Sequence, residues 1–197
     1  MGVILEGKSY SGNMPVLRRG EAKILPGGYK LMQTFPKGTV IPKGTPLHIV
    51  IGTLTAAVSK YAKVVSGGTT TKPRVPKGTL FQINDIVMKE GETTGVTVSS
   101  IDTSNADYDV LTLSSAISGL AADDVLIEAT ATSSSAAKYD PNAVVGEDTE
   151  PLSGGDQDTV SAAYDAVVLL GYTVQLPASW MQGICMKNNP NIIYVKQ

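Results

Sequence analysis

The sequence is poor in the residues on which most enzyme sites depend. Its 197 residues include one His, one Cys and one Trp. A lone Cys excludes a disulfide within the chain, and one His with one Cys leaves too few ligands for the common zinc sites. Charged residues make up 17% and aromatic residues 6% of the chain. This composition points away from most enzymes, and we predict no catalytic residue, cofactor or metal site.

Long hydrophobic runs are also absent. The longest, 166–170, is far short of the ~20 residues that a membrane-spanning helix requires. The N-terminal residues 1–8, MGVILEGK, lack the hydrophobic stretch of a secretory signal. We therefore expect a protein that is made in a cytoplasm, has no export signal of its own and has no membrane partner.

Glycine and proline, in contrast, recur in a turn motif. The chain has 20 Gly and 11 Pro, and Pro-Lys-Gly-Thr occurs at 36–39, 42–45 and 76–79. Proline fixes φ and glycine tolerates positive φ, so each copy predicts a compact turn. The copies are irregularly spaced, which indicates a reused turn and not a solenoid repeat.

Short β-prone runs lie between turn residues from 36 to 130. The runs are 40–41, 47–51, 62–65, 80–83, 96–101, 110–113 and 125–129. Short strands joined by tight turns predict a small barrel or sandwich. Apolar spacing leaves 54–61 and 114–120 open as short helices instead.

The character of the sequence changes after this β-rich region. Residues 131–141 are small and polar and are typical of a linker. Within 142–197, apolar side chains recur at helical spacing: Val160, Ala163, Tyr164, Val167 and Val168. We expect one helix there, capped by Asp158 or Thr159 and ended by Gly171, with strands at 172–175 and 191–195.

These patterns predict a mainly β fold: a small barrel or sandwich of short strands, followed by a small α+β C-terminal unit with one helix. The expected segments are an extended N-terminal segment over 1–35, a β-rich domain over 36–130, a linker over 131–141 and the α+β unit over 142–197.

Charge is distributed unevenly along the chain. Residues 1–90 carry a net charge of +9 and residues 91–197 a net charge of −11. Such a chain suits head-to-tail packing or docking on a charged surface. The basic residues are scattered singly among few aromatic residues, which disfavours nucleic acid as a partner. We expect contacts with other protein subunits to involve four basic residues: Arg18, Arg19, Lys23 and Lys30.

Other residues have two readings each. Trp180 fits an interface anchor or a core residue equally well. His48 has no nucleophile or orienting acid near it in the sequence, so a surface or interface histidine is favoured over a catalytic base. The carboxylates at 123–124 and 147–150 fit solvated turns better than a glycosidase pair or a calcium loop.

Several stretches resemble phage head proteins. The run GTVIPKGTPL at 38–47, and YDVLTL at 108–113 followed by GLAADDVL at 119–126, resemble head decoration proteins of tailed bacteriophages. The C-terminal stretches 142–149, 161–165, 180–183 and 189–192 are similar to phage head fibre proteins.

This resemblance implies a structural, non-enzymatic virion protein on the outside of an icosahedral shell. It implies the major capsid protein as partner, a homotrimer, synthesis in the host cytoplasm and a possible host-surface ligand at the exposed end. Without a heptad stretch for a coiled-coil shaft, a compact cap is favoured over a rod. The alternative is a cell-surface carbohydrate- or ligand-binding β module, and a carboxylate-dependent hydrolase ranks third.

Overall fold

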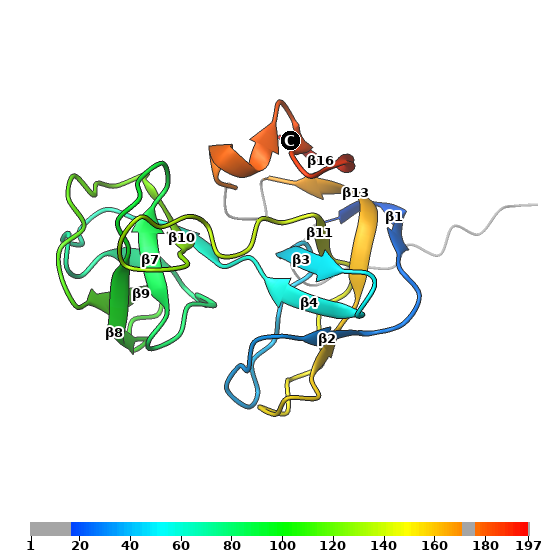
Figure 1. The fold of residues 1–197 in the computed structure, drawn as a ribbon, viewed down its shortest axis with the longest axis horizontal. Coiled ribbons are helices and arrows are strands. Elements are labelled where there is room, and N and C mark those ends of the chain that lie inside the picture. Colours follow the sequence, from blue (N-terminus) through cyan, green and yellow to red (C-terminus); the bar gives the residue numbers. More distant parts are fainter. Residues whose placement is uncertain (1–16, 171–175, 197) are drawn as a thin grey trace, which may run out of the picture.

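The protein is built almost entirely of β-strands. The computed structural model describes residues 17–170 and 176–196, with 17–21 as backbone only. Hydrogen bonding groups the strands into two sheets (Figure 1). Helical structure in the described residues is limited to one 3-10 turn, η1 (Ala178–Trp180). No helix in these residues is long and apolar enough to cross a bilayer. The expected mainly β fold is confirmed.

The larger sheet has ten strands, drawn from both ends of the chain. Along the sheet the order is β12 (Thr159–Val160), β2 (Tyr29–Leu31), β4 (Thr55–Val58), β3 (Pro46–Val50), β11 (Ala143–Val145), β13 (Ala162–Leu169), β16 (Asn189–Val195), β15 (Cys185–Met186) and β14 (Met181–Gln182). The tenth strand, β1 (Leu17–Ile24), pairs antiparallel with β13.

The smaller sheet is formed by one continuous stretch of chain and curls into a small barrel. Its order is β5 (Tyr61–Lys63), β10 (Val125–Glu128), β7 (Ile86–Lys89), β8 (Val96–Asp102), β9 (Tyr108–Leu113) and β6 (Arg74–Pro76). A bridge between Val65 and Arg74 joins the two ends of this path, with the Val65 amide donating to the Arg74 carbonyl at 2.9 Å. The side chains inside form one apolar cluster.

The two sheets divide the chain differently from the expected segments. The barrel is inserted between β4 and β11, so strands from 29–58 and 143–195 share the larger sheet. Residues 131–141, expected as a linker, make ordered contacts instead. Ala129 and Ala137 form a bridge, and the buried Ser135 hydroxyl accepts the Ala131 amide at 3.1 Å.

The helix expected near 160–168 is wrong, because this segment forms β12 and β13. Strand β13 lies between β1 on one edge and β11 and β16 on the other, and both of its faces contribute buried residues. A strand buried on both faces has apolar side chains at nearly every position, which imitates helical spacing. Asp158 caps a turn instead of a helix: its carboxylate accepts the Ser153 amide and hydroxyl at 2.9 and 2.7 Å. The helix end expected at Gly171 and the strand at 172–175 lie outside the described residues.

The expected turns form where the motif predicted them. Gly38, Gly44 and Gly78 all have positive φ, at 87°, 83° and 82°. In the first two copies the threonine hydroxyl donates to the proline carbonyl, at 2.8 and 2.6 Å.

Some expected elements differ from those observed. The runs 40–41 and 80–83 form no strand, while 54–61 contributes β4 and the start of β5, and 114–120 is a turn. Ile41 and Phe81 instead place buried side chains into the two cores.

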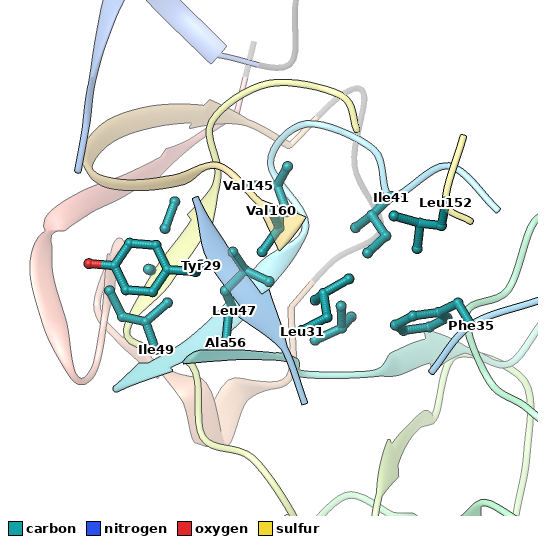
Figure 2. Packing of buried hydrophobic residues seen from close by; sticks show 13 residues of the cluster. Tyr29, Leu31, Phe35, Ile41, Leu47, Ile49, Ala56, Val145, Leu152 and Val160 are labelled. Carbon is teal, nitrogen blue, oxygen red and sulfur yellow. The ribbon is translucent and has the colours of Figure 1, made fainter. Parts of the chain in front are cut away.

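The buried apolar side chains of the described residues form three clusters. One belongs to the larger sheet and extends from Tyr29 and Ile49 at one end to Phe35 and Leu152 at the other (Figure 2). A second fills the barrel. The third joins side chains of both sheets, including Met88 and Ile127 of the barrel. This shared cluster packs the two sheets against each other.

Candidate contact surfaces

A groove of about 660 Å³ lies between the two sheets. One wall comes from loops that connect strands of the larger sheet, residues 34–37, Thr39 and 153–154, and the other comes from the barrel, residues 79–83 with Ile101 and Thr103. Pro36, Lys37 and Thr39 of the first Pro-Lys-Gly-Thr turn line one wall, and Thr79, the last residue of the third turn, lines the other. The Gln82 side-chain amide donates to the Thr34 carbonyl at 3.0 Å and ties the walls together.

Gly154 allows the two loops of one groove wall, around Lys37 and around Gly154, to pack closely against each other. Its φ is +82°, and a Cβ at this position would lie 3.1 Å from the Lys37 amide nitrogen. A larger residue would therefore be strained and would displace the Lys37 backbone.

A network of buried charged side chains lies next to this groove and contacts it through Gln82. The Lys60 ammonium lies 2.7 Å from Asp85 and 3.9 Å from Glu128, and both the Lys60 and Glu128 side chains are 2% exposed. Glu128 also pairs with Lys138 at 2.7 Å. The same Asp85 carboxylate accepts the amide of the groove residue Gln82 at 2.7 Å.

Two further contacts connect this network to the larger sheet. Lys60 Nζ lies 5.4 Å from the centre of the Phe35 ring, and the Gln33 amide donates to Glu128 at 3.3 Å. Gln33 also donates to the Val58 carbonyl at 2.9 Å and accepts the Val58 amide at 2.6 Å. A buried charge network with its partners in place favours one arrangement of its elements, so it stabilises the observed position of the groove residue Gln82, whose amide Asp85 accepts.

The turn between β3 and β4 is a second apolar surface. Val50, Ile51 and Leu54 are 39%, 64% and 50% exposed. Leu54 has φ of 52°, a region that bulky residues rarely occupy. Backbone strain of this kind concentrates at functional positions.

The basic residues expected at subunit contacts lie on two strands. Arg18, Arg19 and Lys23 belong to β1, and Lys30 belongs to β2. Lys23 pairs with Asp165 of β13 at 2.7 Å, with side chains 63% and 40% exposed. This hydrogen bond raises the pKa of Lys23 above its usual range. The structure does not gather all four residues into one site.

Trp180 lies in the core and not on the surface. It is 3% exposed and belongs to the cluster shared by the two sheets. Its ring meets that of Tyr61 edge-on, with centroids 5.6 Å apart. Burial raises the pKa of both Tyr61 and Tyr194, which lie near it. Of the two roles left open by the sequence, the core role fits this position.

In the folded protein, lysines of the basic half of the chain form ion pairs with acidic residues of the other half. Among the side chains that the structure describes, five ion pairs join a lysine from 1–90 to an acid from 91–197: Lys23–Asp165, Lys60–Glu128, Lys63–Asp123, Lys77–Asp109 and Lys89–Asp124. The charge asymmetry of the sequence thus becomes a set of long-range contacts, and the strands interleave the two halves.

The other polar candidates also have local partners. His48 Nδ1 lies 2.8 Å from the Asp140 carbonyl. Asp124 accepts a hydrogen bond from Lys89, which lowers its pKa. In the described part of the chain, no three His, Cys, Asp or Glu side chains are grouped to hold a metal ion.

Sequence reasoning missed both apolar surfaces. The groove needs two loops about 45 residues apart in the chain, and only their shared Pro-Lys-Gly-Thr motif hinted at a relation. For the β3–β4 turn, the sequence predicts a strand as far as Ile51 and leaves 54–61 open as a helix, although the run Val50–Ile51 next to Gly52 is a visible signal of an exposed apolar turn.

Comparisons with protein-family models, with curated proteins and with solved structures each find no match to this chain.

Proposed function

We propose that this protein is a structural virion protein that decorates the outer surface of a tailed-phage capsid, as a head decoration or head fibre protein. It is made in the host cytoplasm and docks as a homotrimer on the major capsid protein. Three modest contacts made together give high avidity. Because the protein would bind only the assembled lattice, it would also stabilise the shell. Its exposed end is free to bind a host-surface ligand.

The open edge of β1 is the observation that carries this proposal. One edge of this eight-residue strand pairs with β13, and no other described strand pairs with its second edge. An unpaired strand edge is a template for another chain, and positive charge on it discourages indiscriminate pairing. Arg18, Arg19 and Lys23 belong to this strand, and Lys23 pairs with Asp165 of β13. The edge therefore fits an acidic partner that offers a strand or loop.

Charge reversal tests the role of this edge. Replacing Arg18 and Arg19 by Glu should weaken binding to purified capsids by about tenfold or more, since like charges across an interface cost several kcal/mol. Lys187→Glu, at an exposed position in the turn between β15 and β16, is the matched control. Unchanged capsid occupancy in the double variant would remove β1 from the docking surface.

Mass spectrometry of gradient-purified virus particles tests the virion role itself. Peptides of this chain should occur in fixed, high proportion to the major shell protein. Their absence from particles, with the protein present in cells, would refute the proposal and bring the alternative forward.

The alternative is a cell-surface carbohydrate- or ligand-binding β module. The groove favours it, because about 660 Å³ lies within the usual range of ligand pockets. Against a sugar ligand, the two phenylalanines in the lining, Phe35 and Phe81, are 2% and 4% exposed and offer little ring surface for stacking. A glycan-binding assay on the purified protein discriminates between the two functions.

A further inference from the structure

Lys60 is buried together with two carboxylates. Its ammonium lies 2.7 Å from Asp85 and 3.9 Å from Glu128, and the three side chains are 2%, 11% and 2% exposed. In every other ion pair among the described side chains, at least one partner is 25% or more exposed. An amine, a carboxyl group and a second acid therefore meet at this one place with little access for water.

Backbone hydrogen bonds hold the three residues in this arrangement. The Glu128 amide donates to the Lys60 carbonyl at 3.0 Å, and the Asp85 carbonyl accepts the Val98 amide at 2.8 Å. The Phe35 ring covers the ammonium, with its centre 5.4 Å from Nζ. Groups held in contact in this way react as if at very high concentration, because folding has already met the entropy cost of bringing them together.

We propose that Lys60 and Asp85 condense into an intramolecular isopeptide bond, with Glu128 as the proton carrier. Nζ of Lys60 becomes the amide nitrogen on Cγ of Asp85, and one water molecule is released. The folded chain makes this modification on itself once, without a cofactor and without a change of oxidation state. Like a disulfide, the bond would restrict the unfolded chain, here across 25 residues. The inference goes beyond the proposed function and does not depend on it.

The reaction needs only proton transfers within this cluster. The Lys60 ammonium passes one proton to the Asp85 carboxylate, because opposite charges in contact neutralise each other readily where water is scarce. The Nζ lone pair then attacks Cγ and a C–N bond forms. The Glu128 carboxylate takes a proton from this nitrogen and gives it to the departing hydroxyl. The C–O bond breaks, water leaves, and Glu128 is a carboxylate again.

Two neighbouring groups suit this reaction. The Gln82 amide donates to Asp85 Oδ2 at 2.7 Å, so it would stabilise the negative charge that develops on this oxygen during the attack. Oδ2 then becomes the amide oxygen, and Oδ1 leaves as water. Lys138 lies 2.7 Å from Glu128 and balances its charge after Lys60 has become neutral. Condensation therefore removes one buried charge of each sign, which lowers the desolvation cost of the cluster.

The mass of the intact wild-type protein tests the bond directly. After prolonged incubation of the folded protein at neutral pH, the mass should lie one water molecule below the value calculated for its N-terminus. Trypsin should leave 44–63 uncleaved after Lys60 and joined to 78–89, because an acylated lysine is not cleaved. An unchanged mass, with 44–60 and 78–89 recovered as separate peptides, would overturn the proposal.

Three variants locate the bond. Lys60→Arg keeps a cation next to both carboxylates but offers no amine, so it should retain its full calculated mass. Asp85→Asn should lose one ammonia molecule instead of one water molecule, because the leaving group changes. Lys63→Met, the control, removes the pair with the exposed Asp123 and should lose water as the wild type does. Loss of water from Lys60→Arg or from Asp85→Asn would place the link elsewhere and contradict the proposal.

Glu128→Gln tests the proton carrier. A glutamine amide does not accept a proton at neutral pH, so this variant should keep its full mass over the time in which the wild type loses water. Near-UV circular dichroism verifies that it is folded. Glu92→Gln, at an exposed position, is the matched control and should form the bond. Complete loss of water in folded Glu128→Gln would remove Glu128 from the mechanism.

Discussion

The Lys60 ammonium and the Asp85 carboxylate form an ion pair inside the molecule, with Nζ and Oδ2 2.7 Å apart and side chains 2% and 11% exposed. Lys60 lies in the connection between β4 and β5, and Asp85 immediately precedes β7. The pair therefore anchors the chain at the point where it passes from the larger sheet into the barrel. Glu128 of β10 lies 3.9 Å from the same ammonium, so this strand is also connected to the network.

Removing Lys60 should destabilise the protein strongly. Lys60→Met leaves Asp85 and Glu128 buried with one cation fewer, and breaking a buried pair in this way costs about 3–5 kcal/mol. Urea denaturation measures the loss. Lys63→Met is the matched control, because Lys63 pairs with Asp123 at 2.7 Å where the aspartate is 83% exposed. That pair should contribute at most about 1 kcal/mol. Equal losses in both variants would contradict the structural role of the Lys60 network.

Acid should destabilise the protein through Asp124. The hydrogen bond from Lys89 lowers the pKa of this carboxyl in the folded state. Its contribution is therefore present above the unfolded value, about 3.9, and is lost as pH falls through the folded value. Urea midpoints between pH 7 and pH 2.5 should fall less steeply in Asp124→Asn than in the wild type. Asp156→Asn, at an exposed position, should leave the profile unchanged, and identical acid limbs in all three proteins would refute the assignment.

Asp109 should hold the third Pro-Lys-Gly-Thr turn in place. Its Oδ2 accepts the amides of Gly78 and Thr79 at 2.9 and 3.1 Å, and its side chain is 2% exposed. Asp109→Ala leaves both amides without this acceptor and should cost about 2–4 kcal/mol in the free energy of unfolding. The exposed Asp107→Ala should stay within about 0.5 kcal/mol. If Asp109→Ala loses no more free energy of unfolding than Asp107→Ala, the turn is stable without the Asp109 carboxylate.

Trp180 should report directly on the core between the sheets. Because it is the single Trp of the chain and is 3% exposed, its emission should be blue-shifted and resist quenching by iodide. Trp180→Ala should cost about 3–5 kcal/mol, as deletion of a large buried ring does. If iodide quenches the folded protein as efficiently as the urea-unfolded protein, Trp180 is exposed. An interface role would then apply again.

The errors of sequence reasoning share a cause. At 160–168 the apolar spacing fitted a helix, yet β13 has neighbours on both edges and buried residues on both faces. Spacing alone does not distinguish a helix face from a doubly buried strand. The charge difference between the chain halves suggested a molecule with opposed ends. The fold instead pairs residues such as Lys89 and Asp124, which only strand pairing brings together.

The mainly β character and the positions of the turns follow from the amino-acid sequence. Both are local properties: proline limits its own φ, glycine accepts positive φ, and β-branched residues favour extended backbone. Long-range contacts, in contrast, set which strands share a sheet, bury Trp180 and bring Lys60 to Asp85 and Glu128. They also form the groove. These features depend on segments far apart in the chain, whose contacts are selected by packing and by the pairing of buried charges and not by any local preference.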